Sequence, residues 1–488
     1  MTKLTENAAP IVSRLPSRLD AALAASSQNP LLWITLVWAL LVLPGFNIRG
    51  AYFEEQTIIG LARGALEDGW WLSPHLYGVR FIERPVLLSW LVAALSWPVG
   101  SIIVPVARLP TVISGLAGAI LVYSLVKQRT SSIGGLVASL CFLASPGVFQ
   151  VLFTAEPDLM LSVLIFSAFV VWWDGEERDK VTVLRWSAIG LLLTAAALAK
   201  GPQPLAFFFL GVFAYLIIRR EWRRILGLGF SGILPAAATA AWYYAVYEPG
   251  DLGLWRHHSR LYFWQNTLGT QLFELLDLTV RFIVAILPSA IIIAIRRPSL
   301  REPGGRGDLL SALLLYASLC TVLLWFWPGA RYRYAMPAFP AFAAAAGILF
   351  DDMRLREDRA RYIGLYAIAA LIGFQVVVNW LVMTNLPDLF AKSRLWGRTV
   401  AAVLATAPAT LYAVYGAADD ALLVYVPPPI RRIPLAGLSE VKFPAWALLT
   451  PEQTSQLQAS RPDLNLQLRL VLSKYDNARL FYIDRTLK

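Results

Sequence analysis

Residues 86–97 read VLLSWLVAALSW, and the fold depends on whether this apolar run crosses a membrane. The chain around it has 488 residues, of which 57% are hydrophobic and 15% are charged. Soluble proteins carry about 25% charged residues. Apolar runs of about 18 residues or more, separated by short charged loops, are instead typical of helical membrane proteins. We therefore expect a polytopic α-helical membrane protein.

The basic residues between the apolar runs predict the topology. Lys and Arg are enriched in cytoplasmic loops, so these clusters should share one side of the membrane with the N-terminus. If every apolar run crosses the membrane, the number of crossings places all five clusters on the side opposite the N-terminus. If residues 86–102 instead form a helix on the outer surface, all of them share one side and about eleven spans remain. The clusters are Lys127/Arg129, Arg178/Lys180/Arg185, Arg219/Arg220/Arg223/Arg224, Arg296/Arg297/Arg301/Arg306 and Arg354/Arg356/Arg359/Arg361.

This topology divides the chain into three parts. Residues 1–30 form a cytoplasmic segment without the apolar core of a signal peptide. Residues 31–384 form the transmembrane domain, in which residues 47–108 make a large outer loop with juxtamembrane helices. Residues 385–488 form a small outer α/β domain, since strand-like runs alternate there with helical stretches. The strand-like runs lie at 421–429, 446–450, 466–473 and 478–484, and the expected helix lies at 394–406.

The composition also restricts the partners. The net charge is +11, but the basic residues lie in loops between spans. Membrane topology explains that pattern, so we expect no nucleic-acid partner. Cys141 and Cys320 both fall within apolar runs. We expect them to be packing residues rather than disulfide partners or metal ligands.

Two adjacent acids follow the first apolar run: Glu54 and Glu55, in FEEQ at 53–56. Neighbouring carboxylates at the membrane edge repel each other, which favours proton uptake by one of them and hence a general base. The alternative is a helix start, where acids stabilise the helix dipole.

A second charged motif, FIERP at 81–85, contains Glu83 and Arg84. Pro85 holds Arg84 in an extended conformation, from which its guanidinium is suited to bind a phosphate. An Arg at this position also fits an alternative role, in which it snorkels to the lipid headgroups.

Other charged residues lie at the outer ends of later spans. Glu156 and Asp158 flank a proline in TAEPDLM, where Asp158 either orients a substrate, pairs with a cation or caps a helix. Lys200, in LAKGPQP, is an isolated cation and favours anion binding. Arg331, Arg333 and Tyr334 begin a late span.

The adjacent His257 and His258 lie in a long outer loop at 248–266 that is rich in Arg and aromatic residues. Metal sites need further ligands at recognisable spacing, and the sequence offers no third ligand here. We therefore assign no metal ligand.

In order and spacing, these motifs resemble the GT-C glycosyltransferases of family 39. That family includes the protein O-mannosyltransferases and the bacterial lipid A aminoarabinose transferase, and the resemblance is greatest to the aminoarabinose branch. It rests on the acidic pair, the [F/I]-E-[K/R]-P element, the acid beside a proline, L-x-K-G-P and R-Y-x-x-P. It covers most of residues 31–383, and the small outer C-terminal domain also fits.

The resemblance implies inverting transfer of a sugar from a polyprenyl-phosphate carrier to an acceptor outside the membrane. By position, Glu54 matches the catalytic acid, Arg84 a Lys near the carrier phosphate with Glu83 before it, and Lys200 the Lys of the K-G-P element. Asp158 matches the acid after the third span, and Tyr334 the Tyr of the late span. With the residues added from the sequence itself, the predicted sites are catalytic, Glu54 and Glu55; donor phosphate-binding, Arg84, Lys200, Arg331, Arg333 and Tyr334; and substrate-positioning, Glu83, Asp158, Glu156, His257 and His258.

The chain departs from the family pattern at three positions. Glu54 replaces the usual Asp, Thr57 stands where the aminoarabinose branch has an Arg, and Thr267 stands where that branch has a His. These departures concern the donor sugar more than the chemistry. The extra arginines would suit an acidic sugar, such as a uronic acid, or a second phosphate.

We therefore predict a glycosyltransferase of the bacterial inner membrane whose active site faces the periplasm. Its acceptor is lipid A, the lipopolysaccharide core or another cell-envelope glycan, and its co-substrate is the lipid-linked sugar donor. A divalent metal stays open, and we expect a monomer. The alternatives are a transporter or flippase of lipid-linked sugars and an inactive receptor or scaffold. Transporters usually carry charges at the bilayer midplane and internal repeats, neither of which is visible here.

Overall fold

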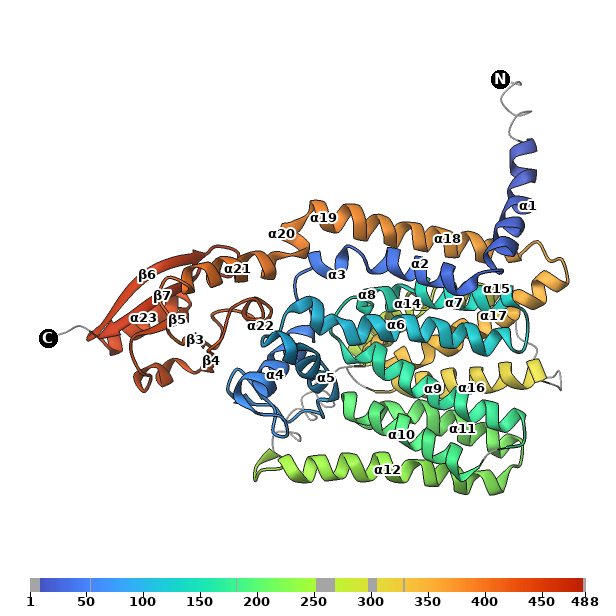
Figure 1. Ribbon diagram of the computed structural model, residues 1–488, viewed down its shortest axis with the longest axis horizontal. Helices are drawn as coiled ribbons and strands as arrows, with labels where there is room; N and C mark the ends of the chain where they lie inside the picture. The colour runs from blue at the N-terminus through green and yellow to red at the C-terminus, as the bar shows by residue number, and fades with distance from the viewer. Residues whose placement is uncertain are drawn as a thin grey trace. The chain divides into compact units, whose positions relative to one another are not determined.

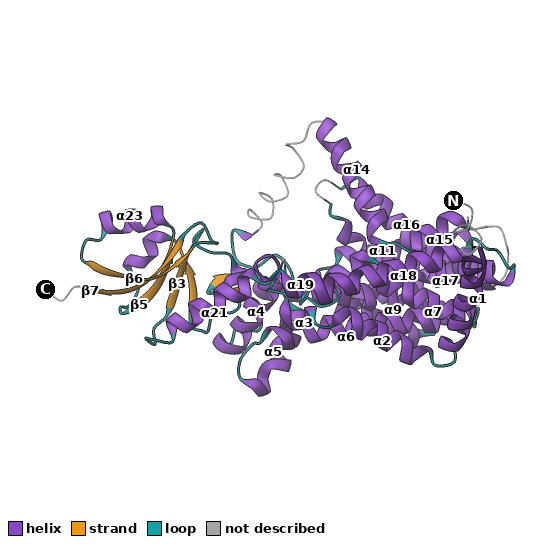
Figure 2. Ribbon diagram, turned by 90° about the horizontal axis from the view of Figure 1, so that it is seen from above, coloured by secondary structure: helices purple, strands orange, loops and turns teal. Residues whose placement is uncertain are grey.

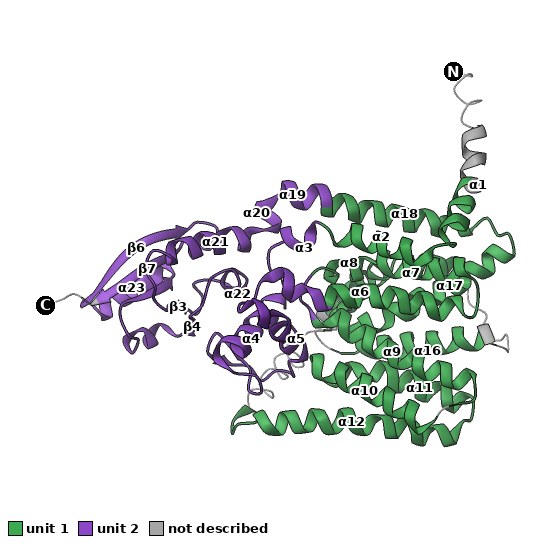
Figure 3. Ribbon diagram, in the orientation of Figure 1, with its two compact units in different colours: residues 1–43, 111–153, 157–379 green, residues 44–110, 154–156, 380–488 purple. Residues whose placement is uncertain are grey.

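The computed structural model describes residues 9–52, 54–180, 182–251, 268–296, 305–327 and 330–485. Its contacts divide the chain into two compact units, coloured separately in Figure 3. Unit 1 comprises Met1–Leu43, Thr111–Phe153 and Pro157–Asn379, and unit 2 comprises Pro44–Pro110, Thr154–Glu156 and Trp380–Lys488. The predicted outer loop and the predicted C-terminal domain therefore belong to one unit.

Unit 1 is a bundle of helices, labelled in Figure 1. Its central helix is α17 (Phe339–Leu355), which belongs to the most buried of the apolar segments. The alanine-rich sequence of α17 lets its neighbours approach closely. A Cβ added at Gly347 would lie 2.4 Å from Ala138 Cβ of the helix α7. The other helices are α1 (Ala9–Ser26), α2 (Pro30–Val42), the main part of α6 (Val104–Lys127), α7 (Ser132–Ala144), α8 (Pro146–Val151), α9 (Pro157–Glu177), α10 (Val183–Lys200), α11 (Ala206–Ile218), α12 (Trp222–Val246), α14 (Leu268–Ala285), α15 (Ser289–Ile295), α16 (Gly305–Trp325) and α18 (Arg361–Val377).

Among the described residues, eight helices are long and apolar enough to cross a membrane. The number is up to nine if the bent pair Leu272–Ala285 and Ser289–Ile295 forms one span. The segment Leu87–Val99 is among the shorter apolar helices, in keeping with its predicted place outside the membrane. Eleven spans would require α7 and α11 to cross as well, and each has only 13 residues. That number stays a prediction.

The loops that carry the basic clusters lie together at one end of unit 1. The hydroxyl of Ser132, after α6, donates to the Ser27 carbonyl before α2 over 3.0 Å. Further contacts join the remaining loops into one network, so the clusters share one side with the N-terminal segment, as the charge pattern predicts. These contacts are Arg361–Asp20, Ser131–Asp351, Arg296–Asp352, Arg129–Glu177, Arg224–Asp179 and Arg219–Asp308.

Unit 2 contains a five-stranded mixed sheet with the strand order β4-β3-β5-β7-β6. Strand β3 (Leu411–Val414) is parallel to β4 (Ile430–Ile433) and β5 (Ala445–Leu449), whereas β7 (Ala478–Arg485) is antiparallel to β5 and β6 (Leu464–Leu472). Figure 2 shows the strands in orange with helices beside them. Leu422 and Val400, from two helices, pack on one face of the sheet, and Leu457, from a third, packs on the other. The helices of unit 2 are α3 (Gly45–Ile48), α4 (Glu55–Asp68), α5 (Leu87–Ser96), α19 (Met383–Asn385), α20 (Pro387–Phe390), α21 (Lys392–Leu404), α22 (Asp420–Leu423) and α23 (Pro451–Ser460), with a small hairpin of β1 (His75–Leu76) and β2 (Val79–Arg80).

The expected class, a polytopic helical protein with a small C-terminal α/β domain, is confirmed. The strand-like runs at 446–450, 466–473 and 478–484 correspond to β5, β6 and β7. The run at 421–429 was predicted wrongly, because it begins as the short helix α22. The Asp419 carboxylate accepts a hydrogen bond from the Leu422 backbone over 3.0 Å and so caps the start of that helix.

Candidate active site

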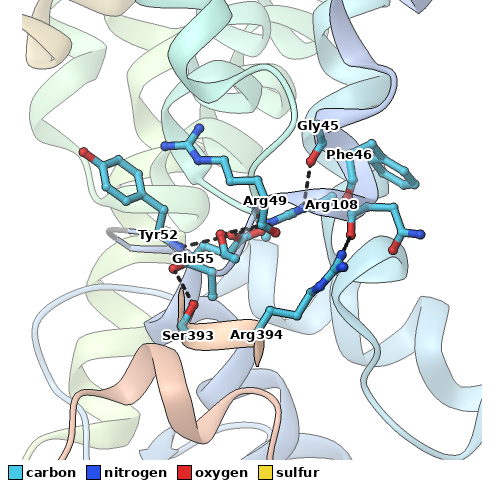
Figure 4. Close-up of polar contacts among 12 residues, drawn as sticks. Gly45, Phe46, Arg49, Tyr52, Glu55, Arg108, Ser393 and Arg394 are labelled. Carbon is cyan, nitrogen blue, oxygen red and sulfur yellow. Dashed lines mark hydrogen bonds and ion pairs between the residues drawn. The ribbon is translucent and has the colours of Figure 1, made fainter. Parts of the chain in front are cut away.

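Glu55 and Arg108 form a fully buried ion pair in unit 2. Nε of Arg108 donates to Oε1 of Glu55 over 2.6 Å, and Nη2 donates to Oε2 over 2.9 Å. Nη1 and Nη2 also donate to the backbone carbonyls of Gly45, Phe46, Arg49 and Gly50. Figure 4 shows Arg108 with Glu55 and Gly45 beside it. Arg108 therefore fixes the backbone of the segment that leads to the acidic pair.

Glu55 makes two further contacts with backbone N–H groups. The Ala155 N–H donates to Oε1 over 3.0 Å, and the Tyr52 N–H donates to Oε2 over 3.3 Å. Both oxygens of Glu55 are therefore occupied by donors within the protein. This carboxylate anchors the segment Thr154–Glu156 to the start of α4.

Glu54, immediately before α4, has different surroundings. Its Oε2 lies 2.9 Å from Nη2 of Arg84, and the two side chains remain 20% and 16% exposed. Arg84 lies in a non-helical segment before Pro85, as the sequence predicts, and Glu83 beside it is exposed. The structure thus joins the FEEQ and FIERP motifs through an ion pair that is not sealed from its surroundings.

Arg49 extends this cluster. Its guanidinium lies over the Tyr52 ring, 4.3 Å from the ring centroid. Burial lowers the pKa of Arg49, and the negative charges of Glu55 and Glu156 oppose that shift. Glu156 is itself buried, with 1% exposure. The cluster in unit 2 therefore contains two further arginines, Arg49 and Arg108, near the predicted acids.

A second cluster lies in unit 1, at the ends of two neighbouring helices. Asp158, in the first turn of α9, accepts a hydrogen bond from Nζ of Lys200, the last residue of α10, over 2.5 Å. Both positions complement the helix dipoles. Nζ of Lys200 also lies 5.5 Å from the centroid of the Tyr334 ring. The structure thus brings together three of the predicted residues.

In this second cluster, one oxygen of Asp158 can still accept a hydrogen bond. Within the described residues, the buried Oδ2 of Asp158 has no hydrogen-bond partner. The Tyr334 side chain is 37% exposed, Arg333 is buried at 7% and Arg331 is exposed. Asp158 and Lys200 therefore form a pair that can accept another polar group.

His257 and His258 lie outside the described residues. Among the residues that are described, no group of three or more His, Cys, Asp or Glu side chains could hold a metal ion.

Sequence reasoning missed Arg49 and Arg108. Arg108 directly precedes an apolar run, and a charge at the start of a membrane span is a signal for a buried partner. Its partner could not be identified in the same way, because the pair is separated by 53 positions.

Comparisons with known proteins find similar sequences and a similar fold. Residues 83–243 match the family described as dolichyl-phosphate-mannose-protein mannosyltransferase. An undecaprenyl phosphate-alpha-4-amino-4-deoxy-L-arabinose arabinosyl transferase from Pseudomonas aeruginosa (strain LESB58) is 25% identical over 244 residues, which cover 48% of this chain and 42% of that relative. The protein of the same name from Edwardsiella ictaluri (strain 93-146) is 27% identical over 220 residues, covering 43% of this chain and 38% of that relative. The matched part is thus less than half of each relative's length.

Two crystal structures of ArnT from Cupriavidus metallidurans share the fold. The apo structure has a TM-score of 0.72 at 17% identity, with 92% of this chain and 97% of that chain covered. The structure bound to undecaprenyl phosphate has a TM-score of 0.69 at 18% identity, with the same coverage of 92% and 97%. The shared fold is that of a multi-pass integral membrane protein. Residues 83–243 thus resemble the dolichyl-phosphate-mannose-protein mannosyltransferase family, and the chain shares its fold with the ArnT structures.

Proposed function

We propose that the chain is an inverting glycosyltransferase of the bacterial inner membrane. It moves a sugar from a polyprenyl-phosphate carrier to a periplasmic acceptor, which is lipid A, the lipopolysaccharide core or another cell-envelope glycan. The observation that carries this proposal is the contrast between the two acids. The Glu55 side chain is fully buried in its ion pair with Arg108, whereas the Glu54 side chain is one-fifth exposed in its ion pair with Arg84.

In this mechanism Glu54 is the general base and Glu55 is a positioning residue. A base must reach the proton that it removes, and the Glu55 oxygens already accept hydrogen bonds from Arg108, Tyr52 and Ala155. Glu54 accepts the proton of an acceptor hydroxyl, and that oxygen bonds to the anomeric carbon. The bond between that carbon and the phosphate oxygen breaks, and its electron pair stays on the carrier phosphate. Attack from the face opposite the leaving group inverts the anomeric centre.

The cations hold the donor phosphate. Arg84 and Lys200 are the principal candidates, with Arg331, Arg333 and Tyr334 as further contacts. Arginine binds phosphate through paired N–H donors, and lysine acts as a point charge. Positive groups aimed at the leaving phosphate stabilise charge that develops in the transition state. The open oxygen of Asp158 supports a substrate-positioning role beside Lys200, and Glu83 and Glu156 are assigned the same role.

The test is mass spectrometry of lipid A, core sugars and prenyl-phosphate lipids from cells that lack the gene. The wild-type chain, Glu54→Gln and the control Glu67→Gln, which lies near the other end of α4, are each restored on a plasmid. We expect the deletion to lose one sugar from a glycan and to accumulate its prenyl-phosphate form.

Wild type and Glu67→Gln should restore the sugar. Glu54→Gln should reduce transfer at least about a hundredfold, because general-base catalysis contributes about 10²–10⁴-fold. Full transfer by Glu54→Gln would contradict the role of Glu54. An unchanged glycan profile, with a prenyl-linked sugar shifted between leaflets, would instead support a flippase.

A further inference from the structure

A cleft of about 480 Å³ lies at the end of unit 1 that carries the basic loops. It is lined by the last turns of α6 and α9 and by the first turn of α10. Its position is remote from the second cluster, because Asp158 and Asp174 lie near opposite ends of α9. Sixteen residues of α helix separate them by about 24 Å. The cleft is therefore distinct from the cluster of Asp158 and Lys200.

The polar wall of the cleft holds three arginines around one acid. Asp174 lies 2.9 Å from Arg178, 3.0 Å from Arg185 and 3.9 Å from Arg129. Nη2 of Arg129 also lies 2.7 Å from Oε2 of Glu177. Three cations therefore face two carboxylates, which leaves the cleft with an excess of positive charge.

Donors remain available on this wall. Among the described residues, Arg185 contacts its acceptors through Nη1, and Arg178 contacts Asp174 through Nη2. Asp174 and Thr182, which caps the start of α10, hold these helix ends in place. A tetrahedral oxyanion in the cleft could accept the unused guanidinium hydrogens of both arginines, an arrangement in which arginine binds phosphate well.

Part of the cleft lining is apolar. Leu125, Val170 and Val171 line the cleft beside the arginines. The helices that carry them, α6 and α9, are both membrane-span candidates, so the apolar part runs from a span toward its charged end. A ligand that fits both parts of the lining has an anionic head and an apolar body, as a membrane phospholipid does.

We propose that this cleft binds the phosphate headgroup of an anionic phospholipid from the leaflet on the basic side of the protein. Basic pockets between transmembrane helices on that side recognise anionic lipid headgroups. The site is separate from the proposed sugar transfer, and it would hold α6, α9 and α10 together where they meet the membrane surface.

The experiment is native mass spectrometry of the purified full chain in detergent, titrated with dioleoylphosphatidylglycerol or dioleoylphosphatidylcholine. We expect adducts of phosphatidylglycerol at concentrations where phosphatidylcholine gives few. The variant Arg178→Gln/Arg185→Gln should lower the phosphatidylglycerol occupancy at least tenfold. The matched control Arg356→Gln/Arg359→Gln removes two charges from the same end outside the cleft and should stay within twofold of wild type.

A third variant distinguishes a change in lipid binding from a loss of folding. Asp174→Asn removes the central negative charge and should raise phosphatidylglycerol binding, an effect that unfolding would not produce. Competition with inorganic phosphate and glycerol 3-phosphate separates a free anion from a lipid. The proposal would be overturned if the cleft and control variants lost phosphatidylglycerol occupancy equally. Full displacement of the lipid by inorganic phosphate or glycerol 3-phosphate would also overturn it.

Discussion

Each unit contains an ion pair between a carboxylate and a cation, and the two pairs differ in burial and in their other contacts. In unit 2, every oxygen of Glu55 and several carbonyls around Arg108 are engaged by the pair. In unit 1, Lys200 binds one oxygen of Asp158, and the other oxygen has no hydrogen-bond partner among the described residues. A saturated pair can only hold the backbone in place. A pair with an open oxygen can still receive a ligand.

This difference predicts that breaking the saturated pair has the largest effect. Arg108→Leu leaves the Glu55 carboxylate buried with only backbone N–H partners. Loss of one member of a buried pair lowers the free energy of unfolding by about 3–5 kcal/mol. Thermal unfolding in detergent measures this loss.

Two controls accompany that variant. Arg461→Gln breaks an exposed pair of the same unit, in which Arg461 and Asp463 are 25% and 50% exposed, and should lower the free energy of unfolding by at most about 1 kcal/mol. Arg108→Leu/Glu55→Leu removes both charges and should recover part of the stability. If Arg108→Leu unfolds no earlier than Arg461→Gln, the pair is not structural.

The open pair should affect activity more than stability. Lys200→Gln removes a cation that we assign to the donor phosphate, and loss of one such transition-state contact lowers kcat by about 10²–10³-fold. Sugar transfer in membranes and thermal unfolding of the purified chain are measured side by side. A variant that loses stability and activity in parallel would make this pair structural, like that of Arg108 and Glu55.

Arg63 offers an intermediate case, because it is a buried cation that donates hydrogen bonds to backbone carbonyls. Its Nη1 and Nη2 donate to Val426 over 2.8 Å and to Val424 over 2.7 Å, and so attach α4 to the segment after α22. Hydrogen bonds to charged groups contribute about 1.5–3 kcal/mol, so Arg63→Gln should destabilise the chain less than Arg108→Leu. Chemical unfolding would detect the difference, and an effect as large as that of Arg108→Leu would show that no paired acid is needed for such an anchor.

Much of the membrane fold could be predicted because hydropathy and charge act locally. The charge pattern required the five basic loops to share one side, and that requirement predicts that residues 86–102 lie outside the membrane. The contact between Ser132 and Ser27 and the ion pair between Arg361 and Asp20 agree with that topology. The short strands β3 and β4 escaped prediction, since four residues give too little alternation to be distinguished from a loop.

The sequence by itself determined the class of the fold, the side on which the basic loops gather and the motifs that carry the charges. It could not separate Glu54 from Glu55, because both are glutamates in the same motif. Only the tertiary structure shows that the two side chains have different surroundings. Successive residues at a helix start point in different directions, so Glu55 meets Arg108 from 53 positions away while Glu54 meets Arg84. The roles that we propose for the two acids rest on partners that only the folded chain brings to them.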